Sequence, residues 1–462
     1  MTIQKSWRLR LTNITAFSYL GKEFFWVILG EGTSVVGSVV GLRLLTDYLS
    51  PAVFGEIALV MTIAVLVNQT ILGPLAGAAL RFLSPAEEAS STGDYLHALQ
   101  SMIVRVSGFT LLAVAAVSLG LFLWQRLDWV FFLISAITYA LLTGFAQILN
   151  GMQNALRQRK IVAWHSAMGQ WLQVGLVLTA VIYFGPTSRS AMIGYVAAAF
   201  LILPSQMYFF RRKVLTLPGM ATPASQPDTQ TALWQRKLRD YALPFAGWGI
   251  FTWAQMSSDR WSLQASGSTS EVGYYAVLYR LGYYPITLAT GLVIQLISPI
   301  LFQKAGDATD ENRMKATLRV NQGLTTAAFS VTLIAVMLAY FLHPLLFRVL
   351  VSSEYRSISW LLPWIMLAGG LFATGQVATI SLLSEVNTKR LLPPKIGTAV
   401  LATALNFAAA FLYGLPGVIF AGVISGAVYV VWILALIRQN NRQTRRLTSQ
   451  KAQDALQTEE DK

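Results

Sequence analysis

Long apolar runs, separated by short polar stretches, constrain the fold of this chain more than any other feature. A helix needs roughly 20 consecutive apolar residues to cross the hydrocarbon core of a membrane. Lipid offers no hydrogen-bond partners to the backbone, so runs of this length are helices rather than barrel strands. Only 12% of the residues are charged, against about 25% in soluble domains. We therefore predict an all-α polytopic membrane protein.

We expect about twelve membrane spans, several of them interrupted by glycine or proline, which membrane helices tolerate. The predicted spans are residues 24–45, 55–79, 102–124, 128–150, 161–184, 189–210, 243–265, 273–299, 321–343, 358–383, 395–413 and 416–437.

Lysine and arginine gather in alternate connections between the spans. One set includes the basic stretches 157–160, 211–213 and 236–239, whereas the other set holds few cations, such as Arg126 and Arg189. The positive-inside rule then places both termini in the cytoplasm. These loops also account for the net charge of +14, so we expect no nucleic-acid partner.

The longest gap between spans, 211–242, is polar and rich in proline, as linkers are. Segment 50–60 resembles 268–278, and 183–200 resembles 412–429, so the two halves read as a parallel repeat around a central cleft. The predicted organisation is a cytoplasmic amphipathic N-terminus (1–22), a six-helix lobe (23–210), a cytoplasmic linker (211–242), a second six-helix lobe (243–437) and a cytoplasmic tail (438–462).

Glu31 lies within an apolar span, where a charge costs at least roughly 2.5–3.5 kcal/mol. Gly30, Ser34, Gly37 and Gly41 form a stripe of small residues around it, spaced for close helix contact. Glu31 is either a site for a coupling cation or a carboxylate paired with an arginine for packing.

Asp259 and Arg260 lie in another apolar span, beside a polar stretch. Adjacent residues point about 100° apart on a helix, so they are not an ideal self-contained pair, and we expect at least one of them to face the cleft. Arg260 is the first choice for an anion contact. If the span is shorter than predicted, both residues lie at the membrane interface instead.

Arg280 lies among several tyrosines, including Tyr279 and Tyr283. The arginine fork matches phosphate and stacks on aromatic faces, and tyrosine suits sugar rings. The alternative is an interfacial tyrosine belt with an arginine that reaches the headgroups.

Several classes of chemistry lack their motifs. The chain has no cysteine, and His97, His165 and His343 are far apart in sequence, which argues against a metal site. It has no GxxxxGK[ST] loop, GxSxG elbow or HExxH pair. We expect neither an enzyme nor a cofactor.

Five segments carry a resemblance to a known family. They are GSVVGLRLLTDYLSPAVFGEIALV with the following GPLAGAALRFLSP, NGMQNALRQRK, SSDRWSLQASGSTSEVGYYAVLYRL and ALNFAAAFLYGLPGVIFAGVISGAVY. Together they resemble the polysaccharide transporter (Wzx-type, O-antigen flippase-like) branch of the multidrug/oligosaccharidyl-lipid/polysaccharide exporter superfamily.

The resemblance implies a V-shaped, MATE-like transporter of the bacterial inner membrane that works by alternating access. The implied cargo is an undecaprenyl-diphosphate-linked oligosaccharide for O-antigen, exopolysaccharide or capsule synthesis, and polymerase and chain-length proteins are the implied partners. Arg260 and Arg280 would hold the diphosphate or sugars, and Arg81 would meet the headgroup at the inner mouth. Glu31 or Asp259 would bind a coupling H⁺ or Na⁺.

Three other functions are open on the sequence. A multidrug antiporter of the same fold would favour an acidic cavity, whereas the residues above are mostly basic. A membrane polymerase or ligase of the same pathway would need a large outer domain, and no long outer loop is present. A structural or regulatory role does not explain charges inside apolar spans.

Overall fold

The computed structural model describes Trp26 and residues 29–217, 219–220, 227–305, 311–384 and 391–460. Within these ranges the chain is helical with short connections and contains no strand. The predicted amphipathic N-terminus, 1–22, lies outside the described residues. The all-α prediction is confirmed, and the chain is a multi-pass membrane protein.

The chain divides into two compact units, Met1–Trp253 and Ala254–Lys462. The boundary lies within helix α8, Pro227–Ala265. The sequence placed the division at 211–242, but the chain is helical again from Pro227 onward.

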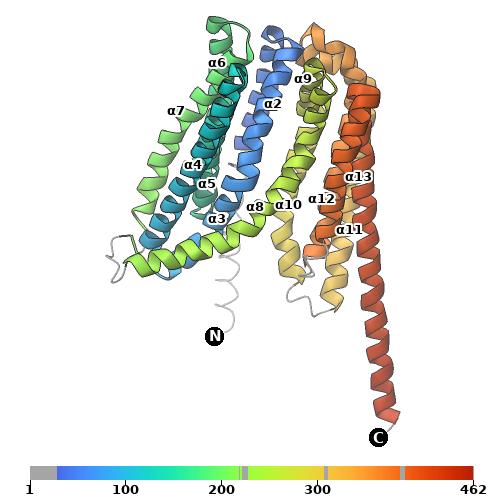
Figure 1. The fold of residues 1–462 in the computed structure, drawn as a ribbon. Coiled ribbons are helices and arrows are strands. Elements are labelled where there is room, and N and C mark those ends of the chain that lie inside the picture. Colours follow the sequence, from blue (N-terminus) through green and yellow to red (C-terminus); the bar gives the residue numbers. More distant parts are fainter. Residues whose placement is uncertain are drawn as a thin grey trace, which may run out of the picture. The chain divides into compact units, whose positions relative to one another are not determined.

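The first unit holds a helix over residues 29–48, followed by seven helical elements and the first part of α8 (Figure 1). These elements are α2 (Pro51–Val67), the π-helical turn η1 (Asn68–Leu72), α3 (Gly73–Glu88), α4 (Thr92–Leu123), α5 (Leu127–Ala155), α6 (Arg159–Phe184) and α7 (Ser188–Val214).

The predicted stripe of small residues packs closely on α6. A Cβ at Gly30 would lie 2.7 Å from that of Ala163, and a Cβ at Gly41 would lie 2.4 Å from a methyl group of Val174. The sequence separation is the same in both pairs, so the helix over 29–48 and α6 run parallel. Glycine permits this approach because it has no side chain.

The first part of α8 packs along the second span of the first unit. Trp253 Nε1 donates to the carbonyl of Thr62 at 2.8 Å, and a Cβ at Gly249 would lie 2.1 Å from the carbonyl oxygen of Gln69. Nearer its start, α8 places Trp234 and Leu238 in the buried core of this unit. Helix α8 therefore runs antiparallel to α3 and α2 and is an integral part of the first unit up to Trp253.

The second unit begins with the end of α8. It continues with α9 (Thr269–Leu278), the π-helical turn η2 (Tyr279–Tyr283), α10 (Tyr284–Ala305), α11 (Glu311–Leu350), the 3₁₀ helix η3 (Ser353–Leu361), α12 (Leu362–Ser384) and α13 (Leu392–Glu460).

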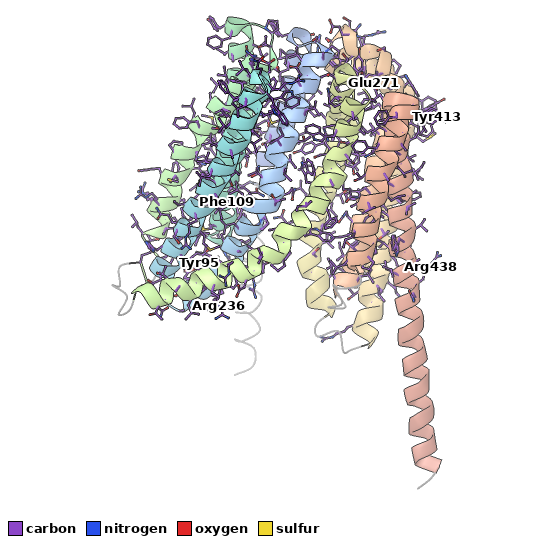
Figure 2. The ribbon with its side chains drawn as sticks, viewed as in Figure 1. Tyr95, Phe109, Arg236, Glu271, Tyr413 and Arg438 are labelled. Carbon is purple, nitrogen blue, oxygen red and sulfur yellow. The ribbon has the colours of Figure 1, made fainter. Side chains whose placement is uncertain are left out.

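Helix α13 is a helical hairpin rather than one rod. Gly414, with φ 59° and ψ −143°, breaks the helix. A Cβ at Gly397 would lie 2.8 Å from the ring of Trp432, so the two arms fold back on each other. Tyr413 and Glu271 lie toward the same end of this unit, and Arg438 lies farther along the second arm (Figure 2).

Nine helices of the described part are long and apolar enough to cross a membrane. One of them, Leu392–Gln439, contains both predicted spans 395–413 and 416–437. Two further predicted spans are not among the nine. Span 24–45 extends beyond the described residues, and 243–265 lies in α8, where polar residues lower the hydropathy.

The predicted repeat recurs in the local structure of both units. Ser50 and Ser268 are the N-cap residues of α2 and α9. Gly185 (φ 96°) and Gly414 (φ 59°) both break the chain before the last span of their half. Only glycine adopts these backbone angles readily. The two resembling segments thus encode the same helix start and the same turn.

Candidate substrate site

Two charged residues lie buried near the end of α8. The side chains of Arg260 and Asp259 are 12% and 10% exposed, and Arg260 Nη1 lies 3.1 Å from Asp259 Oδ1. The two neighbours thus pair with each other, although their directions on the helix are not ideal for a pair. The arginine side chain folds back along the helix, where the same Nη1 also donates to the carbonyl of Met256 at 2.8 Å.

The carboxylate is held from both sides. Its Oδ1 also accepts the backbone N–H of Arg260 at 2.7 Å, and its Oδ2 accepts a hydrogen bond from the hydroxyl of Tyr275. Beside it, Asn406 Nδ2 donates to Ser258 Oγ at 2.9 Å, which ties α8 to α13. Buried charges are retained where they are paired and hydrogen-bonded, as here.

The guanidinium of Arg260 lies over two tyrosine rings. Its central carbon is 4.6 Å from the ring centre of Tyr279 and 5.4 Å from that of Tyr275. Such contacts between a cation and an aromatic face are stronger when they are shielded from water. The structure thus gives Arg260 the stacking position that the sequence suggested for Arg280.

The tyrosines continue into a row of aromatic rings. Tyr279 and Tyr283 are stacked with centres 4.9 Å apart, Tyr283 stacks on Phe372 at 6.4 Å, and Phe372 stacks on Tyr429 at 5.4 Å. In a regular α-helix with 3.6 residues per turn, side chains four residues apart point in slightly different directions. The π turn η2 has more residues per turn and rotates the side chains back the other way. The turn therefore keeps Tyr275, Tyr279 and Tyr283 in one line.

Glycines of α12 make room for these rings. A Cβ at Gly369 would lie 3.1 Å from the ring of Tyr283, and one at Gly375 would lie 2.5 Å from the ring of Tyr429. Phe372, Tyr429 and Asn406 also belong to the site and were not predicted from the sequence. The glycine-rich stretch of α12 was the available signal, because it indicates close contact with another helix.

The remaining predicted site residues take no part in the contacts of this cluster. Arg280 is half-buried in η2 and makes no ion pair or hydrogen bond within the described ranges. Glu31 is half-buried and Arg81 is exposed, both in the first unit. Neither has an ion-pair partner among the described residues. The structure therefore brings together Asp259, Arg260, Tyr279 and Tyr283 within the second unit. Arg280 makes none of these contacts, and Glu31 and Arg81 belong to the other unit.

This cluster combines a fixed cation with flat aromatic surfaces inside an apolar helix bundle. A guanidinium binds phosphate oxygens, and tyrosine rings pack on the apolar faces of sugars while their hydroxyls remain available for hydrogen bonds. A carboxylate beside the cation provides a place for a proton or a metal cation.

Comparisons with known proteins identify the family and the fold of this chain. The sequence model of a family described as "Polysaccharide biosynthesis protein" matches residues 20–304. A search of curated proteins finds no match.

Solved structures with the same fold include a lipid II flippase, MurJ, in an inward closed conformation. It has a TM-score of 0.63 and 14% identity, with 90% of this chain and 87% of that chain covered. An inward-facing multidrug resistance MATE family transporter has a TM-score of 0.58 and 14% identity, with 90% of this chain and 95% of that chain covered. A variant of the Vibrio cholerae MATE transporter VcmN has a TM-score of 0.52 and 14% identity, covering 88% and 98%. These similarities show the fold.

Proposed function

Because the chain belongs to the polysaccharide biosynthesis protein family and has a transporter fold, we propose that it is a flippase of the bacterial inner membrane. Its proposed cargo is an undecaprenyl-diphosphate-linked oligosaccharide, moved from the cytoplasmic to the periplasmic leaflet by alternating access. Both termini lie in the cytoplasm in this proposal. Polymerase and chain-length proteins of the same pathway are the proposed partners.

The buried Arg260 with its tyrosine row is the observation that carries the proposal. Charged side chains are rare inside membrane proteins and mark the pathways of polar cargo. A diphosphate cannot enter hydrocarbon unaided, because burying its charge without partners is prohibitive. A guanidinium offers it a bidentate partner. The adjacent rings of Tyr279 and Tyr283 offer stacking surfaces for the first sugars.

The ion pair suggests how cargo binding is coupled to an ion. A diphosphate that binds Arg260 competes with Asp259 for the same guanidinium. The displaced carboxylate is left buried with the hydroxyl of Tyr275, and a buried carboxylate without a cation takes up a proton or Na⁺. Binding of the anionic headgroup and binding of the coupling ion are then linked at Asp259.

Two other arginines have proposed supporting roles. Arg280 lies one residue from Tyr279 and has no ion-pair partner in the described part of the chain, so it is available to a second phosphate or an acidic sugar. Arg81 is exposed on α3 and would meet the headgroup at the cytoplasmic mouth. Glu31 remains a second possible site for the coupling ion.

A deletion strain complemented with variants tests the proposal. We expect Arg260→Ala and Arg280→Ala to abolish surface glycan while the protein remains in the membrane, and we expect lipid-linked oligosaccharide to accumulate in the inner leaflet. Arg348→Ala, an exposed arginine of the same unit, is the matched control and should complement fully. Normal surface glycan in both site variants would refute the site assignment. Normal glycan in the deletion strain itself would refute the function.

A further inference from the structure

A pocket of about 310 Å³ lies within the first unit, whereas the Arg260 cluster belongs to the second. It is bounded by η1, α3, α5 and α8. Small-molecule sites occupy roughly 300–1,000 Å³, so this pocket is at the small end of that range. It has room for a small polar ring, not for a whole oligosaccharide.

The pocket exists because glycines, which have no side chain, line one of its walls. Gly73 and Gly77 of α3 line it, and a Cβ at Gly77 would meet only the ring of Tyr241, at 3.9 Å. The close contact of Gly249 with the Gln69 carbonyl brings α8 against η1 beside the pocket. The π turn and the glycines thus hold the backbones in place while leaving space between α3 and α8.

The wall contributed by α8 is aromatic. Tyr241, Phe245 and Trp248 line the pocket, and the first two rings are 5.2 Å apart and inclined at 39°. Phe245 is 49% exposed. Such rings offer flat apolar faces with little conformational entropy to lose on binding.

The polar groups of the pocket are neutral. The side-chain amides of Gln69 and Gln147 and the hydroxyl of Tyr241 make no hydrogen bond with other described residues. Each amide offers both donors and acceptors. None of the side chains that line the pocket is charged. Neutral amides beside aromatic faces match a ring that carries hydroxyl groups on its edge and C–H groups on its face.

We propose that this pocket is a subsite for one uncharged sugar residue of the lipid-linked glycan. This inference rests on the proposed function and adds the class of ligand that the first unit recognises. Arg81 lies one helical turn beyond Gly77 on the same face of α3. A sugar in the pocket therefore lies close to a cation that can hold a neighbouring phosphate.

Binding of two lipids to the purified full-length protein in nanodiscs tests the subsite. The probes are undecaprenyl diphosphate and the same lipid bearing N-acetylglucosamine, with affinities measured by native mass spectrometry. We expect the sugar-bearing lipid to bind more tightly than the bare lipid. Each lost hydrogen bond lowers affinity by about three- to tenfold, so Gln69→Ala with Gln147→Ala should remove most of this preference. Affinity for the bare lipid should not change.

Gly77→Leu is a second variant, because a leucine there fills the pocket without meeting backbone. The matched control is Gly108→Leu on α4, where a Cβ would meet nothing within 4 Å. Gly77→Leu should abolish the preference and Gly108→Leu should retain it. An equal affinity of the wild type for both lipids, or a preference that survives Gly77→Leu, overturns the subsite. Phosphatidylglycerol serves as a third probe. The subsite is also overturned if Gly77→Leu changes the binding of phosphatidylglycerol and of neither undecaprenyl lipid.

Failure of the proposed function has a different signature, namely that neither lipid binds. The pocket is then judged by saturation-transfer NMR with free methyl glycosides of glucose, galactose, N-acetylglucosamine and rhamnose. Signal from at least one glycoside, lost in Gly77→Leu and retained in Gly108→Leu, supports a sugar subsite. No saturation transfer to any of them overturns it.

Discussion

The two units use the same backbone feature with different side chains. Each has a π turn in its second span, η1 (Asn68–Leu72) in the first unit and η2 (Tyr279–Tyr283) in the second. Beside η1 lie glycines, neutral amides and an open pocket. Beside η2 lie a buried ion pair and a closely packed row of rings. Wide turns of this kind are frequent at functional sites, because they redirect side chains without ending the helix.

The difference indicates a division of labour between the units. A neutral pocket suits a ring with hydroxyl groups, whereas a paired cation suits an anion that can replace its carboxylate. In the proposed flippase, we therefore assign the diphosphate and the first sugars to the second unit, and a further uncharged sugar to the first unit. The following predictions test this assignment.

The largest effect is expected from removing the cation of the second unit. Removing one partner of a buried ion pair leaves the other charge unpaired, which lowers the free energy of unfolding by about 3–5 kcal/mol. Arg260→Ala therefore changes both anion binding and stability. The double variant Asp259→Asn with Arg260→Gln removes both charges and preserves shape. We expect it to fold and yet to lose binding of undecaprenyl diphosphate by at least about tenfold.

Thermal unfolding and native mass spectrometry of the double variant separate the two roles. A folded protein that binds the bare lipid as well as the wild type does would show that Arg260 serves only packing. The anion site would then have to be sought at Arg280 or in the first unit.

The next effect concerns the coupling ion and compares the two units directly. In proteoliposomes, an imposed H⁺ or Na⁺ gradient should stimulate flipping of a fluorescent lipid-linked sugar by the wild type. Asp259→Asn should abolish this stimulation, since a neutral amide does not take up a proton and lacks the negative charge that attracts Na⁺. Glu31→Gln should retain it, because Glu31 has no cationic partner among the described residues that cargo could displace. The reverse result would assign the coupling site to the first unit.

A smaller effect is expected at neighbouring glycines of α8. A Cβ at Gly249 would lie 2.1 Å from the backbone of Gln69, whereas one at Gly247 would meet nothing within 4 Å. Overpacking typically costs about 1–3 kcal/mol, so Gly249→Ala should lower the Tm by several degrees. Gly247→Ala should leave the Tm unchanged or raise it, because alanine is the better helix former. Equal Tm values for the two variants would refute the packing of α8 on η1.

The smallest effect is expected at the two turn glycines of the repeat. Alanine at Gly185 or Gly414 should lower the free energy of unfolding by about 1–2 kcal/mol, because both residues have positive φ, which strains a residue with a side chain. Similar decreases in Tm are expected for both, measured against Gly120→Ala, which lies in open space on α4. A decrease confined to one variant would show that the two halves do not share this turn.

Much of the fold could be predicted from the sequence because membrane helices are encoded locally. Ten of the predicted spans lie, to within one residue at their ends, inside the nine helices of the described part that are long and apolar enough to cross a membrane. The stripe of Gly30, Gly37 and Gly41 likewise predicted a close helix contact, although not with which helix. The division between the units was placed at 211–242, since a polar stretch rich in proline does not reveal that α8 packs within the first unit up to Trp253.

The candidate site was predictable only in part. The sequence singled out Asp259, Arg260, Tyr279 and Tyr283, because charges and hydroxyls are conspicuous in apolar spans. It did not predict the pairing of Asp259 with Arg260, since a helical projection gives the direction of a side chain and not its reach. It also assigned the aromatic stacking to Arg280, whereas the guanidinium that lies over Tyr275 and Tyr279 is that of Arg260.

By itself, the sequence determined that this chain is a bundle of membrane helices built from two similar halves, because length, hydropathy and turn glycines act over a few residues. Only the tertiary structure decided which side chains share a site. Phe372 and Tyr429 join the tyrosine row from α12 and α13, and Gln69, Gln147 and Tyr241 meet in one pocket from three different helices. The physical reason is that such contacts depend on how closely helices far apart in sequence approach each other, and that distance is set by the packing of the whole unit.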